Sequence, residues 1–183
     1  MGKCLIAIID MQIGFENDNT RGIDCNIIDF LREIKDVKNC IVVGTRYINN
    51  SETACYKFEG WKACMEGSFE SEMMPSLLPY TEHVFDKNKY SCWNDEFKKF
   101  VKDNHVDKIY FVGVNTGCCV LHSAFDCYND VFDCAVIKDL CGSTSGKREH
   151  EAALIVLESC ITKGRVITSE QAIEEIISNP LYS

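Results

Sequence analysis

The sequence has little of what nucleic-acid-binding and membrane proteins need. Lysine and arginine number 19 against 28 aspartate and glutamate residues, and the formal net charge is −9. Nucleic acid and anionic lipid both attract basic surfaces, so we expect neither nucleic acid nor a membrane as a partner. Every apolar run is far shorter than the ~18 residues of a membrane span. The opening stretch MGKCLIAIIDMQ has one lysine and soon reaches Asp10, which favours a buried strand over a signal peptide and predicts a cytoplasmic protein.

Patterns for binding metals are also scarce. No C-x-x-C pair occurs, and no two of the four histidines stand at the spacing of metal ligands (His83, His105, His122 and His150). Cysteine itself is abundant, with 12 residues. A reducing compartment keeps thiols free, and several of the cysteines lie inside apolar runs. We therefore expect most of them to act as small hydrophobic residues.

Two kinds of apolar pattern alternate along the chain. Continuous apolar runs, typical of strands buried on both faces, cover 4–9, 40–45, 108–113 and 133–138, with shorter candidates at 84–86 and 165–168. Helical patterns fill the gaps at 23–36, 94–104, 119–129, 147–161 and 169–178. No repeat or linker divides the chain, so residues 1–183 are predicted to form one domain. The alternation predicts an α/β fold, a three-layer αβα sandwich around a six-stranded parallel sheet.

Residues 46–82 break this pattern. The stretch has weak periodicity, several aromatic residues, and glycine and proline. It is longer than an ordinary connection in a compact domain. Two interpretations stay open: a surface excursion with a short helix, or a loop that shapes a binding pocket.

Three reactive side chains follow the ends of predicted strands. Asp10 follows the first strand, Lys87 follows 84–86, and the pair Cys118 and Cys119 follows 108–113. Ligands of open parallel sheets bind at the carboxyl ends of the strands, so a carboxylate, an amine and a thiol are expected to converge there. Each residue alone also has a structural explanation, as a turn cap, a solvated lysine or a packed thiol.

The chemistry of this trio is coherent. A thiol becomes a good nucleophile when it loses its proton, and a nearby ammonium or a helix N-terminus favours the thiolate. A carboxylate can take that proton and return it to a leaving amine. The backbone amides of the turn can hold an oxyanion. The trio therefore predicts nucleophilic catalysis by a cysteine.

These segments together resemble the isochorismatase-like cysteine hydrolases, which include nicotinamidases and related amidohydrolases. The matching stretches are IIDMQIGF, KNKYSCW, GVNTGCCVLHSAFDC and VIKDLCGS, and the resemblance spans roughly residues 4–170. It implies that Asp10, Lys87 and Cys119 form the catalytic triad, with Cys118 as a bystander. It also implies an oxyanion hole from the amides of Asn115 and Cys119, and a cis peptide bond at Val114–Asn115. The family's strand order would be 3-2-1-4-5-6, and the chain would form a homo-oligomer.

The sequence departs from the nicotinamidases at one place. These relatives carry an Asp-x-His-x-x-His metal site after the second strand, where this chain reads TRYINNSETACYK. The side chains available there (Tyr47, Asn49, Asn50, Ser51 and Glu52) include no imidazole. We therefore predict an enzyme with no metal and no other cofactor.

The substrate is the least determined feature. The resemblance and the aromatic content suggest Phe15, Trp61, Tyr90 and Trp93 as substrate-binding residues, which would suit a small planar molecule. The expected activity is hydrolysis of a small amide or related C–N bond through a thioester. Two alternatives stay open on the same fold: a non-catalytic binding protein, and a thiol-based redox sensor that uses the many cysteines.

Overall fold

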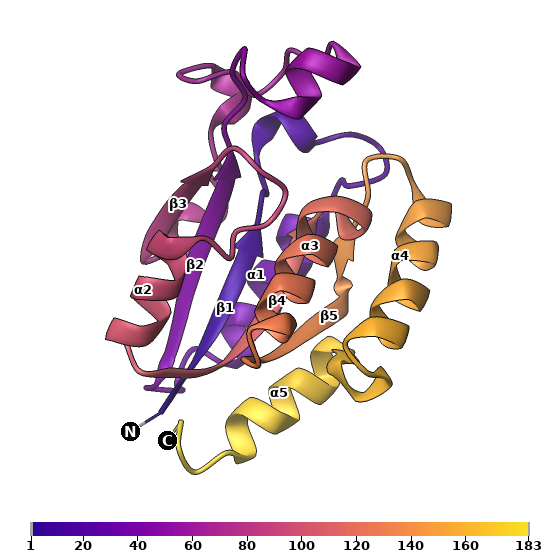
Figure 1. Cartoon of the computed structure of the whole chain (residues 1–183). Coiled ribbons are helices and arrows are strands. Elements are labelled where there is room, and N and C mark those ends of the chain that lie inside the picture. Colours follow the sequence, from indigo (N-terminus) through magenta and orange to yellow (C-terminus); the bar gives the residue numbers. More distant parts are fainter. Residues whose placement is uncertain (1, 183) are drawn as a thin grey trace.

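A six-stranded parallel sheet runs through the centre of the computed structural model, which describes residues 2–182 (Figure 1). The strand order is β3-β2-β1-β4-β5-β6 and every neighbouring pair is parallel. This confirms the expected order 3-2-1-4-5-6. The strands are β1 (Lys3–Ile9), β2 (Cys40–Tyr47), β3 (His83–Lys87), β4 (Val106–Val114), β5 (Asp133–Gly142) and β6 (Val166–Ile167).

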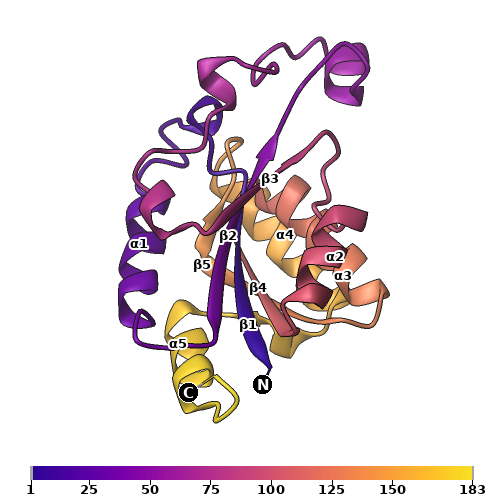
Figure 2. The same cartoon turned by 90° about the vertical axis from the view of Figure 1, so that its left-hand side faces the viewer.

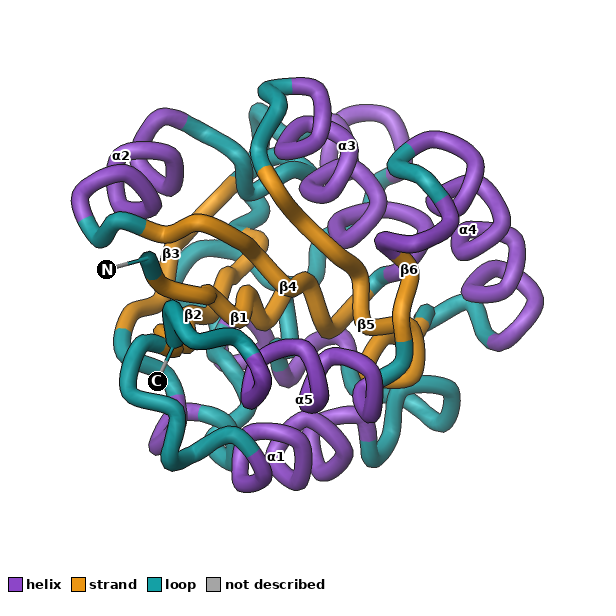
Figure 3. The backbone as a smooth tube through the Cα atoms, turned by 90° about the horizontal axis from the view of Figure 1, so that it is seen from below, coloured by secondary structure: helices purple, strands orange, loops and turns teal. Residues whose placement is uncertain are grey.

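Helices cover both faces of the sheet, as the three-layer prediction requires. Figure 3 shows α1 (Ile23–Glu33) and α5 (Ser169–Ser178) on one face. The opposite face carries α2 (Asp95–Asp103), α3 (Leu121–Asn129) and α4 (Lys147–Cys160). Figure 2 shows α1 on one side of the sheet and α2 and α3 on the other. No helix in residues 2–182 is both long enough and apolar enough to cross a bilayer.

The first strand illustrates why the apolar runs are continuous. Leu5, Ala7 and Ile9 belong to the hydrophobic cluster under α2, α3 and α4, whereas the alternate side chains Ile6 and Ile8 belong to the cluster under α1 and α5. Successive side chains of a strand point to opposite faces, so a strand covered on both faces needs an apolar residue at every position.

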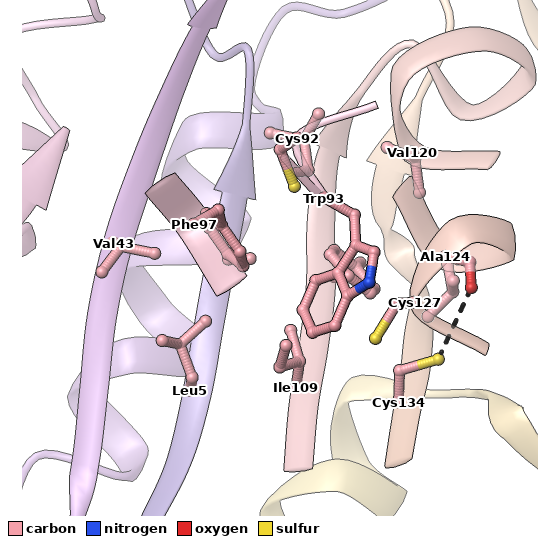
Figure 4. Close-up of a cluster of buried hydrophobic side chains, with 14 of the residues drawn as sticks. Leu5, Val43, Cys92, Trp93, Phe97, Ile109, Val120, Ala124, Cys127 and Cys134 are labelled. Atoms are coloured by element: carbon pink, nitrogen blue, oxygen red, sulfur yellow. Dashed lines mark hydrogen bonds between the residues drawn. The ribbon is translucent and has the colours of Figure 1, made fainter. Parts of the chain in front are cut away.

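Many of the cysteines fill this core. Cys4, Cys127 and Cys134 are fully buried, and all twelve cysteines are free thiols. Figure 4 shows Cys127 and Cys134 side by side in the cluster, with the Cys134 thiol donating to the Ala124 carbonyl at 3.7 Å. These residues fit the expected role of small hydrophobic side chains.

Two predicted elements differ from the observed ones at their ends. The strand predicted at 133–138 continues to Gly142, because its pairing with β4 skips from Phe111–Val136 to Gly113–Cys141. The polar residues Lys138 and Asp139 lie in that irregular stretch and ended the apolar run in the sequence. The helix predicted from 119 starts earlier, with a wide helical turn η5 (Thr116–Val120) that leads into α3.

The first part of the 46–82 segment lies above the carboxyl ends of the strands, and its last part returns along the α1 face of the sheet to the start of β3 (Figures 1 and 2). It contains three short helical turns, η2 (Cys55–Glu59), η3 (Phe69–Ser71) and η4 (Leu78–Tyr80). Trp61 and η3, in the middle of the segment, pack beside η1 (Ile13–Phe15), which follows β1. Because this edge also carries the ends of β1, β3 and β4, the segment shapes a pocket there, which decides between the two interpretations of 46–82.

Candidate active site

Asp10 and Lys87 form a buried ion pair at the carboxyl edge of the sheet. Lys87 Nζ lies 2.6 Å from Asp10 Oδ2, and the two side chains are 2% and 0% exposed. Thr45 on β2 donates its hydroxyl to Asp10 Oδ1 at 2.7 Å and accepts the Asp10 amide at 3.1 Å. Both carboxylate oxygens therefore have a fixed partner, which holds the carboxylate in one orientation.

Lys87 keeps its charge despite its burial. Burial lowers the pKa of Lys87, but the charge and the hydrogen bond of the Asp10 carboxylate outweigh it, and the net pKa is raised above the ordinary lysine value. A second donation from Nζ reaches the Lys89 carbonyl at 3.1 Å. The pair is therefore an ammonium and a carboxylate, since each charge compensates the other in a water-poor environment.

Cys119 lies beside this pair in the turn between β4 and α3. Its side chain is buried, with the residue 5% exposed. Burial raises the pKa of the Cys119 thiol well above its ordinary value; the Asp10 carboxylate raises it further, and Lys87 lowers it only in part. The net shift opposes the thiolate that the neighbouring ammonium was expected to favour. The resting form is the neutral thiol, because desolvation disfavours the charged form.

Backbone geometry positions this thiol. The Val114–Asn115 peptide bond is cis, as the resemblance implied. The Asn115 carbonyl accepts hydrogen bonds from the amides of Cys118 and Val120, at 3.0 and 3.2 Å, rather than from the Cys119 amide. Asn115 Oδ1 accepts the Thr144 amide at 2.7 Å, which ties the turn to the loop after β5.

A second tether joins the turn to α4. Thr116 donates its hydroxyl to the Gly142 carbonyl at 2.8 Å, and His150 Nδ1 lies 2.8 Å from the same hydroxyl. Because the hydroxyl proton goes to Gly142, His150 acts as the donor in the second bond. The turn that carries Cys119 is therefore fixed from two directions.

A cavity of about 370 Å³ opens onto Cys119. Asn115 and Cys119 line it, together with three of the four predicted substrate-binding residues, Phe15, Trp61 and Tyr90. The volume suits a small molecule. The structure thus brings the nucleophile candidate and the oxyanion-hole candidates to one concave surface, with Asp10 and Lys87 buried behind it.

The aromatic walls come from segments far apart in the sequence. The rings of Phe15 and Trp61 stack with centroids 5.6 Å apart and planes at 15°. The ring centroid of Tyr47, at the end of β2, lies 5.9 Å from that of Trp61, so Tyr47 extends this wall. Together they give the cavity an aromatic side against which an apolar or planar group can pack.

The fourth predicted aromatic residue, Trp93, is not among the residues that line this cavity. Its ring packs between Phe97 and Phe132, and the residue is 8% exposed. The indole nitrogen donates to Asp130 Oδ2 at 2.7 Å. Figure 4 shows the ring in the core above Ile109. A buried indole N–H needs an acceptor, and Asp130 supplies one.

Sequence reasoning missed several cavity residues. The structure adds Cys55 and three glutamates, Glu16, Glu59 and Glu149, to the lining. Glu149 belongs to the first turn of α4, where an acidic residue is expected for helix stability alone. No local pattern marks it as a site residue, because its approach to the nucleophile turn depends on how α4 packs.

The segment after β2 has the wrong donors for a metal. Asn49 is fully buried and its amide nitrogen donates to the carbonyls of Trp61 and Ala63, at 2.9 and 3.1 Å. Its side-chain oxygen accepts the Thr53 hydroxyl. Within residues 2–182, no three His, Cys, Asp or Glu side chains are grouped so as to hold a metal ion. The residues present therefore do not fit the metal site of the nicotinamidases.

Comparison with known sequences identifies the domain. Residues 3–171 match the family model described as the Isochorismatase domain. Two proteins of Dictyostelium discoideum, Isochorismatase family proteins 1A and 1B, are each 30% identical over 92 residues. That stretch covers 49% of this chain and 43% of each relative, so the match spans less than half the length of those proteins.

Solved structures share the same fold. An isochorismatase-like hydrolase from Alkaliphilus metalliredigens superposes with a TM-score of 0.84 at 19% identity, covering 95% of this chain and 99% of that one. A cysteine hydrolase from Pseudomonas syringae has a TM-score of 0.81 at 17% identity, covering 96% and 93%. Nicotinamidase from Bacillus subtilis has a TM-score of 0.77 at 18% identity, covering 91% and 99%. With the domain match over residues 3–171, the chain belongs to the isochorismatase-like hydrolase family.

Proposed function

We propose that this protein hydrolyses a small amide or a related C–N bond through a thioester on Cys119. The observation that carries the proposal is the position of the Cys119 thiol. Cys119 lines the cavity, and the pKa of its thiol is raised by Asp10 and lowered by Lys87, which lie buried behind it. A nucleophile, a base and a fixed ammonium are thus grouped at the wall of a pocket of suitable size.

The reaction begins with the thiol. Asp10 takes the proton of Cys119 as Sγ attacks the substrate carbonyl, so the thiolate forms only while the C–S bond forms. The carbonyl π electrons move to oxygen, and the amides of Asn115 and Cys119 donate to this oxyanion. When the C–N bond breaks, the proton on Asp10 passes to the leaving amine and a thioester remains on Cys119.

Water completes the cycle. Asp10, ionised again, takes a proton from the water that attacks the thioester. The second tetrahedral intermediate collapses, the C–S bond breaks, and Sγ recovers a proton from Asp10. Lys87 stays charged throughout and balances the negative charge that moves between Asp10 and Cys119, which its raised pKa supports.

The proposal needs a reduced nucleophile. All twelve cysteines are free, including Cys118 beside Cys119. A cytoplasmic location, where thiols stay reduced, is therefore part of the proposal. The substrate carbonyl is polarised by backbone amides, and no step passes through a metal.

The test is a screen of small amides, ureides and carbamoyl compounds, followed by intact-mass measurement with the slowest substrate found. We expect an acyl adduct on Cys119 and a loss of turnover of at least about 1,000-fold in Cys119→Ala. Cys118→Ala is the matched control, because it removes the neighbouring thiol and should still form the adduct. Wild-type turnover by Cys119→Ala would refute the mechanism.

The amide screen tests one alternative, and treatment with mild peroxide tests the other. A non-catalytic binding protein would bind members of the screen without turnover or adduct. A redox sensor would form disulfides or sulfenic acids at several cysteines under mild peroxide, and exposed Cys25 and Cys160 would react first.

A further inference from the structure

The cavity next to Cys119 has an unbalanced charge. Three glutamates, Glu16, Glu59 and Glu149, line it, and its lining, all within residues 2–182, includes no lysine, arginine or histidine. Lys87 lies behind the wall, where its charge is already paired with Asp10. A substrate that enters the cavity therefore meets carboxylates with no compensating cation.

The three carboxylates are not neutralised by the protein. None of them takes part in an ion pair within the part of the chain that the structure describes. Glu59 accepts only the Tyr90 hydroxyl, at 3.5 Å. Glu149 accepts the Ser143 hydroxyl through Oε2. Neutral hydroxyl partners orient a carboxylate and leave its charge in place.

Glu149 lies against the turn that carries Cys119. Its Oε1 lies against Gly117, so close that a Cβ added to Gly117 would meet it at 2.6 Å. Gly117 belongs to the turn that carries Cys119. Burial raises the pKa of the neighbouring Cys118 thiol, and the charges of Glu149 and Glu59 raise it further. Both carboxylates therefore act on the space beside the nucleophile.

The aromatic wall favours the same kind of ligand as the carboxylates do. Phe15, Tyr47 and Trp61 form a continuous set of rings, and Tyr90 lines the cavity as well. The faces of aromatic rings carry negative potential and attract cations, most strongly when the cation is poorly hydrated. Aromatic rings recognise quaternary ammonium ligands in this way, and nearby carboxylates add a Coulombic attraction for the same charge.

We propose that the substrate of this cavity is an amide that carries a positive charge, and that Glu59, Glu149 and the aromatic wall select it over neutral and anionic amides. The proposal rests on the proposed function, because it assigns the substrate class of the same site. The cationic group would contact Trp61 and the carboxylates while the amide carbon reaches Cys119. An anionic amide would face uncompensated like charge and be rejected.

The test uses three benzamides of similar size with different charge at the para position: trimethylammonium, tert-butyl and carboxylate. We expect kcat/KM to fall in that order. In Glu149→Gln, the ratio of kcat/KM for the cationic to the neutral amide should fall on the order of tenfold, since one of the attracting charges is removed. Glu151→Gln is the matched control, because Glu151 lies on the exposed side of the same helix and pairs with Lys147 at 3.6 Å. It should leave the ratio unchanged.

Binding to Cys119→Ala, measured by calorimetry with the same three amides, separates this proposal from the proposed function. Tighter binding of the cationic amide without turnover by the wild type would support the charge preference and count against the mechanism. Turnover that depends on Cys119 but favours the neutral or the anionic amide would keep the mechanism and overturn the charge preference. Failure of the cationic amide to bind Cys119→Ala more tightly than the other two would overturn it as well.

Discussion

Lys87 is expected to matter for stability as much as for chemistry. In Lys87→Met the carboxylate of Asp10 keeps its buried position and its Thr45 partner but loses the only ion pair that compensates its charge within the described residues. Breaking a buried pair by removing one partner typically costs ~3–5 kcal/mol. We expect a loss of this size in urea unfolding, together with loss of activity. Lys89→Met, two residues away and exposed, is the control and should unfold like the wild type; an equally stable Lys87→Met would contradict the pairing.

The pH dependence of activity follows from the neutral resting thiol. Burial and Asp10 hold the pKa of Cys119 well above its ordinary value, and the raised pKa of Lys87 keeps the ammonium charged. Raising the pH through about 8.5, where an ordinary thiol ionises, should therefore change neither group. We expect kcat/KM to stay level between about pH 7.5 and pH 9.5.

The exposed thiols give the internal reference for this measurement. Cys25 and Cys160 lie on the surface, so their alkylation rate should rise across the same pH range as they ionise. An activity profile that rises in parallel with that alkylation would show that a free thiolate of ordinary pKa is the reacting species.

At the scale of elements, the junction of β1 and β4 controls where Asp10 and Cys119 meet. Gly113 pairs with Ile9, the residue before Asp10, and has a positive φ of 107°. A Cβ at Gly113 would meet the Ile9 carbonyl oxygen at 2.2 Å. Both the backbone conformation and the close approach therefore require glycine.

We expect Gly113→Ala to lower both stability and activity. The backbone strain alone corresponds to roughly 1–3 kcal/mol, and the clash would push Ile9, and with it Asp10, away from Cys119. Thermal unfolding and kcat are the two measurements. Gly164→Ala is the control, because nothing lies within 4 Å of a Cβ added there. If Gly113→Ala kept wild-type kcat, the spacing of β1 and β4 would not set the catalytic geometry.

The side chains after β2 lead us to predict that turnover does not depend on a metal ion. Its buried polar residue, Asn49, is fully used in holding the backbone of Trp61 and Ala63. Turnover should therefore persist after exhaustive dialysis against EDTA, with a sample dialysed against plain buffer as reference. Added Zn²⁺, Mn²⁺ or Fe²⁺ should not increase it. Activity that is lost to EDTA and returns with one of these ions would show that the donors of a metal site have been missed.

For the whole molecule, the fold could be predicted from the sequence because both faces of the sheet are covered. Full burial forces continuous apolar runs such as 4–9 and 108–113, and these are easy to recognise. The final part of β5 was missed because Lys138 and Asp139 interrupt its run. The placement of Asp10, Lys87 and Cys119 at one edge follows from the same logic, since all three come at strand ends.

The rest of the site depends on tertiary packing that leaves no local pattern. Glu149 reaches the cavity only because α4 packs its first turn against Gly117. Trp93 turns into the core because Asp130, 37 residues later, offers an acceptor for its indole. Neither the approach of α4 nor the position of Asp130 can be inferred from the residues around these side chains.

The surface of the whole molecule bears on self-association, which stays a prediction. α4 exposes two adjacent branched apolar side chains, Ile155 at 70% and Val156 at 44%. Exposed apolar side chains lose unfavourable contact with water when a second copy covers them. We expect light scattering at about 10 µM to give at least twice the chain mass of 20.8 kDa. We expect Ile155→Lys to lower that mass.

Ile177→Lys, on α5 at 54% exposure, is the matched control and should leave the mass unchanged. A wild-type mass near that of one chain would refute self-association, and an unchanged mass in Ile155→Lys would place the contact elsewhere than on α4.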